Sequence, residues 1–202
     1  MFKTKAPGDR TGSPRERGFT LVEILLVIVL LGIALLIAVP TLHRLQVKSQ
    51  TSRAVRGADT VFLLARGAAL KRHSPVGIVI KATAPQFTIF EDWDPNNANV
   101  ATNGNGVKDA SEDLIATRTL GSGVELSSGP SGDTDPKSDL KGTTVFYGQD
   151  GALRSAGGAL YLADNRGNVF RILVVAATGA ARSEKWTGTT WTPRREQWVW
   201  KF

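Results

Sequence analysis

The chain has 202 residues, no cysteine, two histidines and a formal net charge of +7. This length is enough for one membrane segment and one globular domain with its own core. The absence of cysteine excludes a disulfide framework and a thiolate metal site. With only two histidines, the sequence does not favour a histidine zinc site or a Ser-His-Asp triad. The basic excess permits contact with anionic lipid or nucleic acid but lies below that of a dedicated nucleic-acid-binding protein.

The N-terminal region divides into a polar segment and an apolar one. Residues 1–18 are interrupted by proline and glycine, which makes a helix there unfavourable. Residues 19–39 form an apolar run whose only charge is Glu23. As a helix this run would span about 30 Å, which is one hydrocarbon thickness. No small-x-small cleavage site follows it, so we expect residues 19–40 to remain as a membrane span. Basic residues flank both ends, and the positive-inside rule alone does not orient it.

Glu23 is unexpected in such a span, because an ionised carboxylate in a bilayer costs about 2.5–3.5 kcal/mol. One interpretation is that its side chain snorkels to the interface. Another is that it pairs with a charge on a second chain, such as a new α-amino group at Phe19 made by cleavage after Gly18. The residues alone leave both open.

The stretch Arg17-Gly18-Phe19-Thr20-Leu21-Val22-Glu23 resembles the class III signal of type IV pilins and type II secretion pseudopilins. The resemblance implies that a prepilin peptidase removes residues 1–18 as a cytoplasmic leader and that Phe19 is then N-methylated. It also implies a single-pass protein of the inner membrane with its C-terminal domain in the periplasm. In such families Glu23 would dock the subunit by pairing with the Phe19 amino group of a neighbouring subunit.

The helical pattern continues over residues 41–75, the expected amphipathic second half of the helix. One apolar stripe steps by three and four residues and predicts the core-facing side. Its members are Val55, Ala58, Phe62, Ala65 and Ala69. A basic excess on this segment indicates a solvated face near anionic head groups, with nucleic-acid contact as the alternative. Ser74-Pro75 should end the helix.

Residues 76–202 have the composition of a β-rich domain. Short β-prone runs are expected at 76–80, 86–90, 114–120, 143–147, 159–162 and 169–175, with a hairpin turn at 164–168 and a loop over 127–142. The predicted fold class is therefore α+β, with a long N-terminal helix packed on an antiparallel β-sheet.

The β-rich region resembles the GspH/FimT subgroup of minor pseudopilins. The stretch Val145-Phe146-Tyr147-Gly148-Gln149-Asp150-Gly151 is similar to its strand and turn, and residues 178–182 are similar to its Gly-Arg-x-Arg ending. Ala180 stands where the subgroup would have arginine, which weakens the implied DNA-binding element.

Residues 92–112 are rich in oxygen ligands and suggest calcium. On the EF-hand pattern, Gly106 takes the glycine position but Ala101, which cannot ligate, falls on the first position. Asp92, Asp94 or Asp113, which lie outside this register, could complete the site. The candidate ligands are Asp92, Asp94, Asn103, Asn105, Asp109 and Glu112. The alternative is a polar loop whose asparagine, aspartate and glycine only form turns.

Four of the five tryptophans lie in the last 17 residues, among basic side chains. Basic and aromatic residues together can bind nucleic acid, and the candidate contacts are Arg182, Lys185, Arg194 and Arg195. The alternation at 198–200 instead favours a half-buried last strand or an edge that docks a partner.

These patterns predict a minor pseudopilin of a type II secretion system that helps to initiate or cap the periplasmic pseudopilus. The alternative is a FimT-type minor pilin that binds DNA for natural transformation. The expected partners are other pilin or pseudopilin subunits, the prepilin peptidase, the inner-membrane assembly platform and membrane lipid. No arrangement of catalytic residues indicates an enzyme, and calcium is the one cofactor considered.

Overall fold

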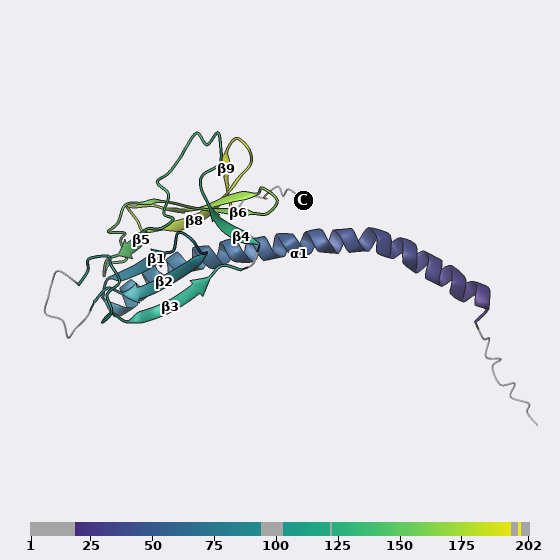
Figure 1. Cartoon of the computed structure of the whole chain (residues 1–202), viewed down its shortest axis with the longest axis horizontal. Coiled ribbons are helices and arrows are strands. Elements are labelled where there is room, and N and C mark those ends of the chain that lie inside the picture. The colour runs from purple at the N-terminus through teal and green to yellow at the C-terminus, as the bar shows by residue number, and fades with distance from the viewer. Residues whose placement is uncertain (1–18, 94–102, 122, 195–197, 199–202) are drawn as a thin grey trace, which may run out of the picture. The chain divides into compact units, whose positions relative to one another are not determined.

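The computed structural model in Figure 1 describes residues 19–93, 103–121, 123–194 and 198. The chain forms two compact units, Met1–His43 and Arg44–Phe202. The leader predicted at residues 1–18 lies outside the described residues.

One helix, α1 (Leu21–Arg72), supplies the described secondary structure of the first unit and continues into the second. It contains an 18-residue window of mean hydropathy 3.2, none of which is buried within the protein. By length and composition α1 is therefore able to cross a membrane. Helical structure continues through Pro40, where the Thr41 hydroxyl donates a hydrogen bond to the carbonyl of Ile37 at 3.1 Å. Local unwinding at this proline is not seen.

In the second unit, one face of α1 is buried and matches the predicted stripe. Its buried residues are Thr51, Ala54, Val55, Ala58, Val61, Phe62, Ala65 and Ala69. The helix ends after Arg72, where His73 adopts a left-handed conformation with φ +52°. Ser74-Pro75 follows, so the predicted end of the helix is confirmed.

The β-rich region contains two antiparallel sheets, whereas the sequence predicted one. The first has the strand order β3-β2-β1-β5 and the second β4-β6-β7-β8-β9. The α+β class is confirmed, but β4, β8 and β9 were not predicted as strands. The strands are β1 (Val76–Ile80), β2 (Gln86–Glu91), β3 (Leu114–Thr119), β4 (Val124–Ser127), β5 (Thr144–Tyr147), β6 (Gly158–Asp164), β7 (Val169–Val174), β8 (Ala181–Trp186) and β9 (Trp191–Pro193).

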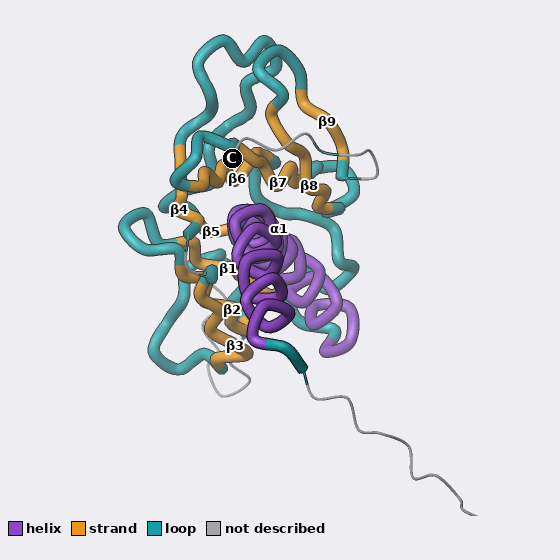
Figure 2. Tube along the Cα trace, turned by 90° about the vertical axis from the view of Figure 1, so that its right-hand side faces the viewer, coloured by secondary structure: helices purple, strands orange, loops and turns teal. Residues whose placement is uncertain are grey.

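The larger of two hydrophobic clusters joins the second-unit part of α1 to both sheets. Phe62 of α1, Phe87 of β2 and Phe170 of β7 all belong to it and are fully buried. Figure 2 looks along the helix and shows the two sheets on different sides of it. The buried part of the helix contains four alanines, which allow close packing against this core.

Gly77 of β1 is required by its cross-strand neighbour. It lies opposite Phe90 of β2 in the antiparallel register. A Cβ atom at residue 77 would lie 2.2 Å from Cζ of Phe90, far inside van der Waals contact. The buried phenyl ring therefore occupies the space that any side chain at this position would take.

Candidate assembly segment and binding sites

The start of α1 contains the residues that the sequence linked to assembly. The Thr20 hydroxyl accepts a hydrogen bond from the backbone N–H of Glu23 at 3.2 Å, so Thr20 caps the helix and Glu23 occupies its first turn. A carboxylate there also interacts favourably with the positive end of the helix dipole. Glu23 therefore also stabilises the start of its own helix, a role that the sequence alone did not indicate. Phe19 is 78% exposed, and Gly18 lies outside the described residues.

The large apolar side chains of residues 19–39 form a continuous exposed surface. Each is between 45% and 80% exposed. A contiguous apolar surface of this length needs lipid or other protein around it. The segment is therefore suited both to membrane insertion and to packing against similar helices.

The candidate cation loop brings together three of the predicted carboxylates. Asp92, directly after β2, is fully buried, and its carboxylate accepts hydrogen bonds from the backbone N–H groups of Gly104 (3.0 Å) and Gly106 (2.6 Å). The Glu112 carboxylate accepts one from the Asp109 N–H at 2.7 Å. Asp94 lies outside the described residues.

The electrostatics of this loop are unfavourable for negative charge. Burial, together with the neighbouring carboxylates of Asp92 and Asp109, raises the pKa of Glu112 to about 7, against one stabilising hydrogen bond from the Asp109 N–H. The Lys108 ammonium donates to the backbone carbonyls of Asp109 and Glu112, at 3.0 and 3.4 Å. Within the described ranges, no three His, Cys, Asp or Glu side chains already surround one point as a metal-ligand set.

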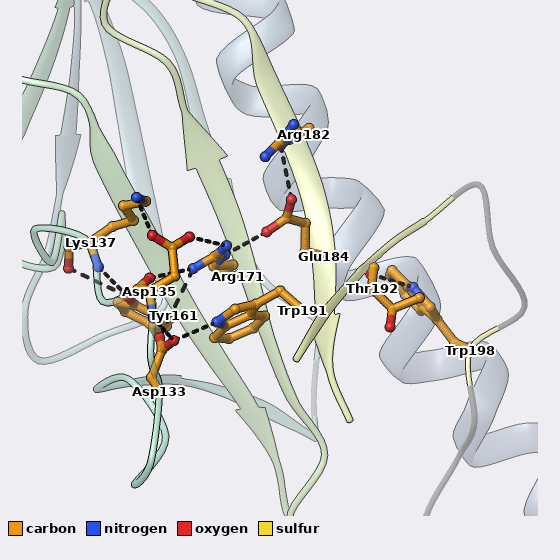
Figure 3. A network of polar contacts seen from close by, with 10 residues as sticks. All are labelled: Asp133, Asp135, Lys137, Tyr161, Arg171, Arg182, Glu184, Trp191, Thr192 and Trp198. Carbon is orange, nitrogen blue, oxygen red and sulfur yellow. Dashed lines mark hydrogen bonds and ion pairs between the residues drawn. The ribbon is translucent and has the colours of Figure 1, made fainter. Parts of the chain in front are cut away.

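The C-terminal sheet contains a buried ionic network that the sequence analysis did not identify. Arg171 of β7 is 2% exposed and donates from Nε to Glu184 of β8 at 2.6 Å. It also donates to the Asp135 carbonyl (2.9 Å) and carboxylate (3.2 Å), and its guanidinium lies 4.3 Å from the ring centroid of Trp191. The Trp191 indole N–H donates to Asp133 at 2.9 Å. Figure 3 shows how these contacts hold the 128–143 connection against the sheet.

The candidate DNA contacts that the structure describes, Arg182, Lys185 and Arg194, do not form one exposed basic surface. Arg182 is exposed but paired with Glu184 at 2.9 Å, as Figure 3 shows. Lys185 is only 3% exposed, and its ammonium lies 5.7 Å from the ring centroid of Phe170. Arg194 lies 4.0 Å from Asp59 of α1, and Arg195 lies outside the described residues. Arg182 and Lys185 are three residues apart in β8, so their side chains point to opposite faces of the strand, and Lys185 belongs to a run of three buried polar residues.

Trp198 has a packing role. Its ring centroid lies 5.4 Å from that of Phe170, and its indole N–H donates to the Thr192 carbonyl at 3.1 Å. It is not in a strand, and residues 199 and 200 of the predicted last strand lie outside the described residues. The aromatic tail therefore contributes at least one side chain to the core.

Two family models match the chain. The prokaryotic N-terminal methylation motif matches residues 13–39, and the type II transport protein GspH model matches residues 54–179. The chain belongs to the GspH family. It is thus a pilin-like subunit of the kind that assembles with other such subunits, and the family resemblance stated from the sequence is confirmed.

Two solved structures are similar to this chain. The minor pseudopilin EpsH from the type 2 secretion system of Vibrio cholerae shares 12% identity, with a TM-score of 0.44, over 66% of this chain and 95% of that one. The type IV minor pilin FimU of Pseudomonas aeruginosa shares 10% identity, with a TM-score of 0.42, over 71% and 92%. No curated protein matches the chain.

Proposed function

We propose that this protein is a minor pseudopilin of a type II secretion system that helps to initiate or cap the pseudopilus. The observation that supports this most directly is that one chain carries the methylation motif over residues 13–39 and the GspH domain over residues 54–179. The exposed apolar segment of α1 would insert into the inner membrane before assembly and pack between neighbouring helices afterwards. The second unit would lie in the periplasm.

Maturation follows from the same proposal. The prepilin peptidase would cut between Gly18 and Phe19, and Phe19 would be N-methylated. The helix begins at Leu21, so the new amino group would lie within a turn of the helix start, where the dipole disfavours a positive charge. Glu23 of a neighbouring subunit would offset that charge. Intact-mass measurement of the membrane-extracted protein tests this, because a chain that still begins at Met1 beside an active peptidase contradicts it.

The role of Glu23 can be separated from its part in the helix start. Glu23→Ala should insert and be cleaved normally but fail to enter filaments, because the neighbour's ammonium would lose its partner. Thr20→Ala is the matched control, since it removes the hydroxyl that accepts the Glu23 N–H but keeps the carboxylate. Cross-linking into filaments measures assembly. Equal incorporation of Glu23→Ala and the wild type would show that Glu23 serves only its own helix.

Deletion of the gene in its own host distinguishes the two proposed systems. We expect loss of protein secretion with unchanged uptake of DNA, and restoration of secretion by the wild-type gene. Loss of transformation with normal secretion would favour the FimT-type alternative. That alternative is less well supported by the described surface, because Lys185 is buried and Arg182 and Arg194 lie beside carboxylates.

DNA binding can also be measured directly. We expect the purified protein to bind duplex DNA no more tightly than about 10⁻⁵ M at physiological salt, because few phosphates would be neutralised. Fluorescence anisotropy at about 150 mM salt measures this affinity. Sub-micromolar binding that is lost in Arg194→Ala would instead favour DNA capture.

A further inference from the structure

We propose that the loop of residues 103–112, completed by Asp92 from the end of β2, is a calcium-binding site. The central observation is Glu112, which is 6% exposed and has one carboxylate oxygen, Oε1, buried without a hydrogen-bond partner. Oδ2 of Asp109 is also buried without a partner. Buried carboxylate oxygens normally have a donor or a cation, since leaving them unpaired costs about 1–3 kcal/mol or more.

The long-range contact of Asp92 supplies the ligand that the sequence pattern lacked. In the linear pattern the first position falls on Ala101, which has no oxygen in its side chain. The folded chain instead directs the Asp92 carboxylate to the backbone of Gly104 and Gly106, within the loop. Each carboxylate oxygen has a second lone pair, so these hydrogen bonds hold Asp92 in place while leaving acceptor capacity for a cation.

The remaining positions of the loop agree with an EF-hand-like ligand order. Gly106 has φ +76°, which suits the sharp turn required at the sixth position. Asn103 and Asn105 would provide amide oxygens, and Val107 a backbone carbonyl. Asp109 stands at the ninth position, which often binds through water, and Glu112 at the twelfth, which binds directly. A water-bridged Asp109 requires only two directly binding carboxylates, which is consistent with the absence of a three-residue set among the described side chains.

Charge explains why the site would take a divalent cation. The carboxyl groups of Asp92 and Glu112 both accept hydrogen bonds from backbone N–H groups of this loop, and buried oxygens of Asp109 and Glu112 have no hydrogen-bond partner. Lys108 is the cation that contacts this loop, but its hydrogen bonds go to the carbonyls of Asp109 and Glu112. A divalent ion between the carboxylates would remove their mutual repulsion.

The ligand set favours calcium over other metals. All candidate ligands are oxygen atoms, which excludes a preference for zinc or copper. Several come from one loop and from carbonyl groups, an irregular arrangement that Ca²⁺ accepts and that Mg²⁺, which needs near-ideal octahedral geometry, does not. A Kd of about 10⁻⁴–10⁻³ M is expected, as for extracellular calcium modules.

The test is thermal unfolding of the full-length protein in detergent, by calorimetry, in EDTA, in 10 mM CaCl₂ and in 10 mM MgCl₂. If Kd is about 10⁻⁴ M, calcium should raise Tm by at least about 5 °C, and magnesium by much less. Glu112→Gln keeps the shape of the side chain but should lose most of the calcium-induced shift. Asp109→Asn provides a second variant at the loop and should weaken the calcium response several-fold.

Glu125→Gln on β4 is the matched control, since it removes the same charge from an exposed position and should keep the full response. The proposal is overturned if calcium produces no shift in the wild type, if magnesium produces an equal one, or if Glu112→Gln responds as the wild type does. Each of these outcomes is independent of whether the protein acts in secretion.

Discussion

Two groups of carboxylates in this protein have opposite surroundings. Around Arg171, Glu184 and Asp135 have a guanidinium within hydrogen-bonding distance, at 2.6 and 3.2 Å. In the 103–112 loop, Asp92 and Glu112 are buried like Glu184, but the nearby ammonium of Lys108 contacts backbone carbonyls. The first group carries its countercharge in the chain, and we infer that the second takes it from solution.

The difference also appears in ionisation. Lys137 and Arg171 lower the pKa of Asp135, so that side chain is charged at neutral pH. Burial and neighbouring carboxylates raise the pKa of Glu112 to about 7. A nearby cation therefore favours the charged carboxylate, whereas burial beside other carboxylates favours the neutral acid.

Removing the countercharge from the first group should have the largest effect. Arg171→Met leaves the buried Glu184 with only the exposed guanidinium of Arg182 beside it, and we expect the free energy of unfolding to fall by about 3–5 kcal/mol. Urea unfolding measures this value. Adding Glu184→Gln to Arg171→Met should recover a substantial part of the loss, since the uncompensated charge is then removed. No recovery in the double variant would mean that the arginine acts through packing on Trp191 rather than through charge.

In the second group, Asp92 should be stabilising even without calcium, because it accepts two backbone hydrogen bonds. Asp92→Asn replaces one acceptor oxygen with a donor, which would face a backbone N–H. We expect a loss of about 1–3 kcal/mol in EDTA. Asp113→Asn, on an exposed side chain nearby, is the control and should remain within about 0.5 kcal/mol. A neutral Asp92→Asn would show that these hydrogen bonds contribute little.

The edge of the Arg171 network allows a finer test. Trp191→Phe keeps an aromatic ring near the guanidinium but removes the indole N–H that donates to Asp133. The expected loss is about 1 kcal/mol in thermal or urea unfolding. Trp93→Phe, at a residue that is 44% exposed, is the comparison. A loss equal to that of Arg171→Met would show that the network depends on Asp133 more than on Glu184.

Asp59 is intermediate between the two groups. Burial raises its pKa above 3.8, and Arg194, 4.0 Å away, partly opposes this. The folded state therefore keeps a proton that the unfolded state releases, and this contribution to stability is lost as the pH rises above about 4 through the folded pKa. Relative to Asp59→Asn, the wild type should lose a small amount of stability over that window. A Tm difference that is constant from pH 4 to 7 would contradict this.

The parts of the fold that the sequence predicted correctly depend on local patterns. The apolar stripe from Val55 to Ala69 and the end of the helix at Ser74-Pro75 are each determined by residues that are close together in the sequence. Strands β8 and β9 have no such pattern. Three consecutive residues of β8 are buried because a neighbouring loop covers its second face, and that loop is recruited by Arg171 from a different strand. Division of the strands into two sheets likewise depends on long-range pairing.

The same distinction explains the candidate sites. The motif around Phe19 and Glu23 is contiguous, so the sequence alone shows it, whereas the capping hydrogen bond to Thr20 depends on where the helix begins. The calcium pattern is incomplete in the sequence, because its first position falls on Ala101. Asp92 lies nine residues before that position, and only the fold brings its carboxylate to the backbone of the loop. Lys185 appeared available for DNA because composition does not reveal which charged side chains a sheet buries.

The contact between Gly77 and Phe90 has a consequence for how this family can vary. A side chain at residue 77 and a full phenyl ring at residue 90 cannot occupy the same space, since the nearest atoms would be 2.2 Å apart. The two positions should therefore change together. Relatives that carry alanine or a larger residue at the position of Gly77 are expected to carry a smaller side chain opposite, and an aligned set of relatives would show the pair as coupled. Phe90→Leu should accordingly make Gly77→Ala more tolerable than it is beside the phenyl ring.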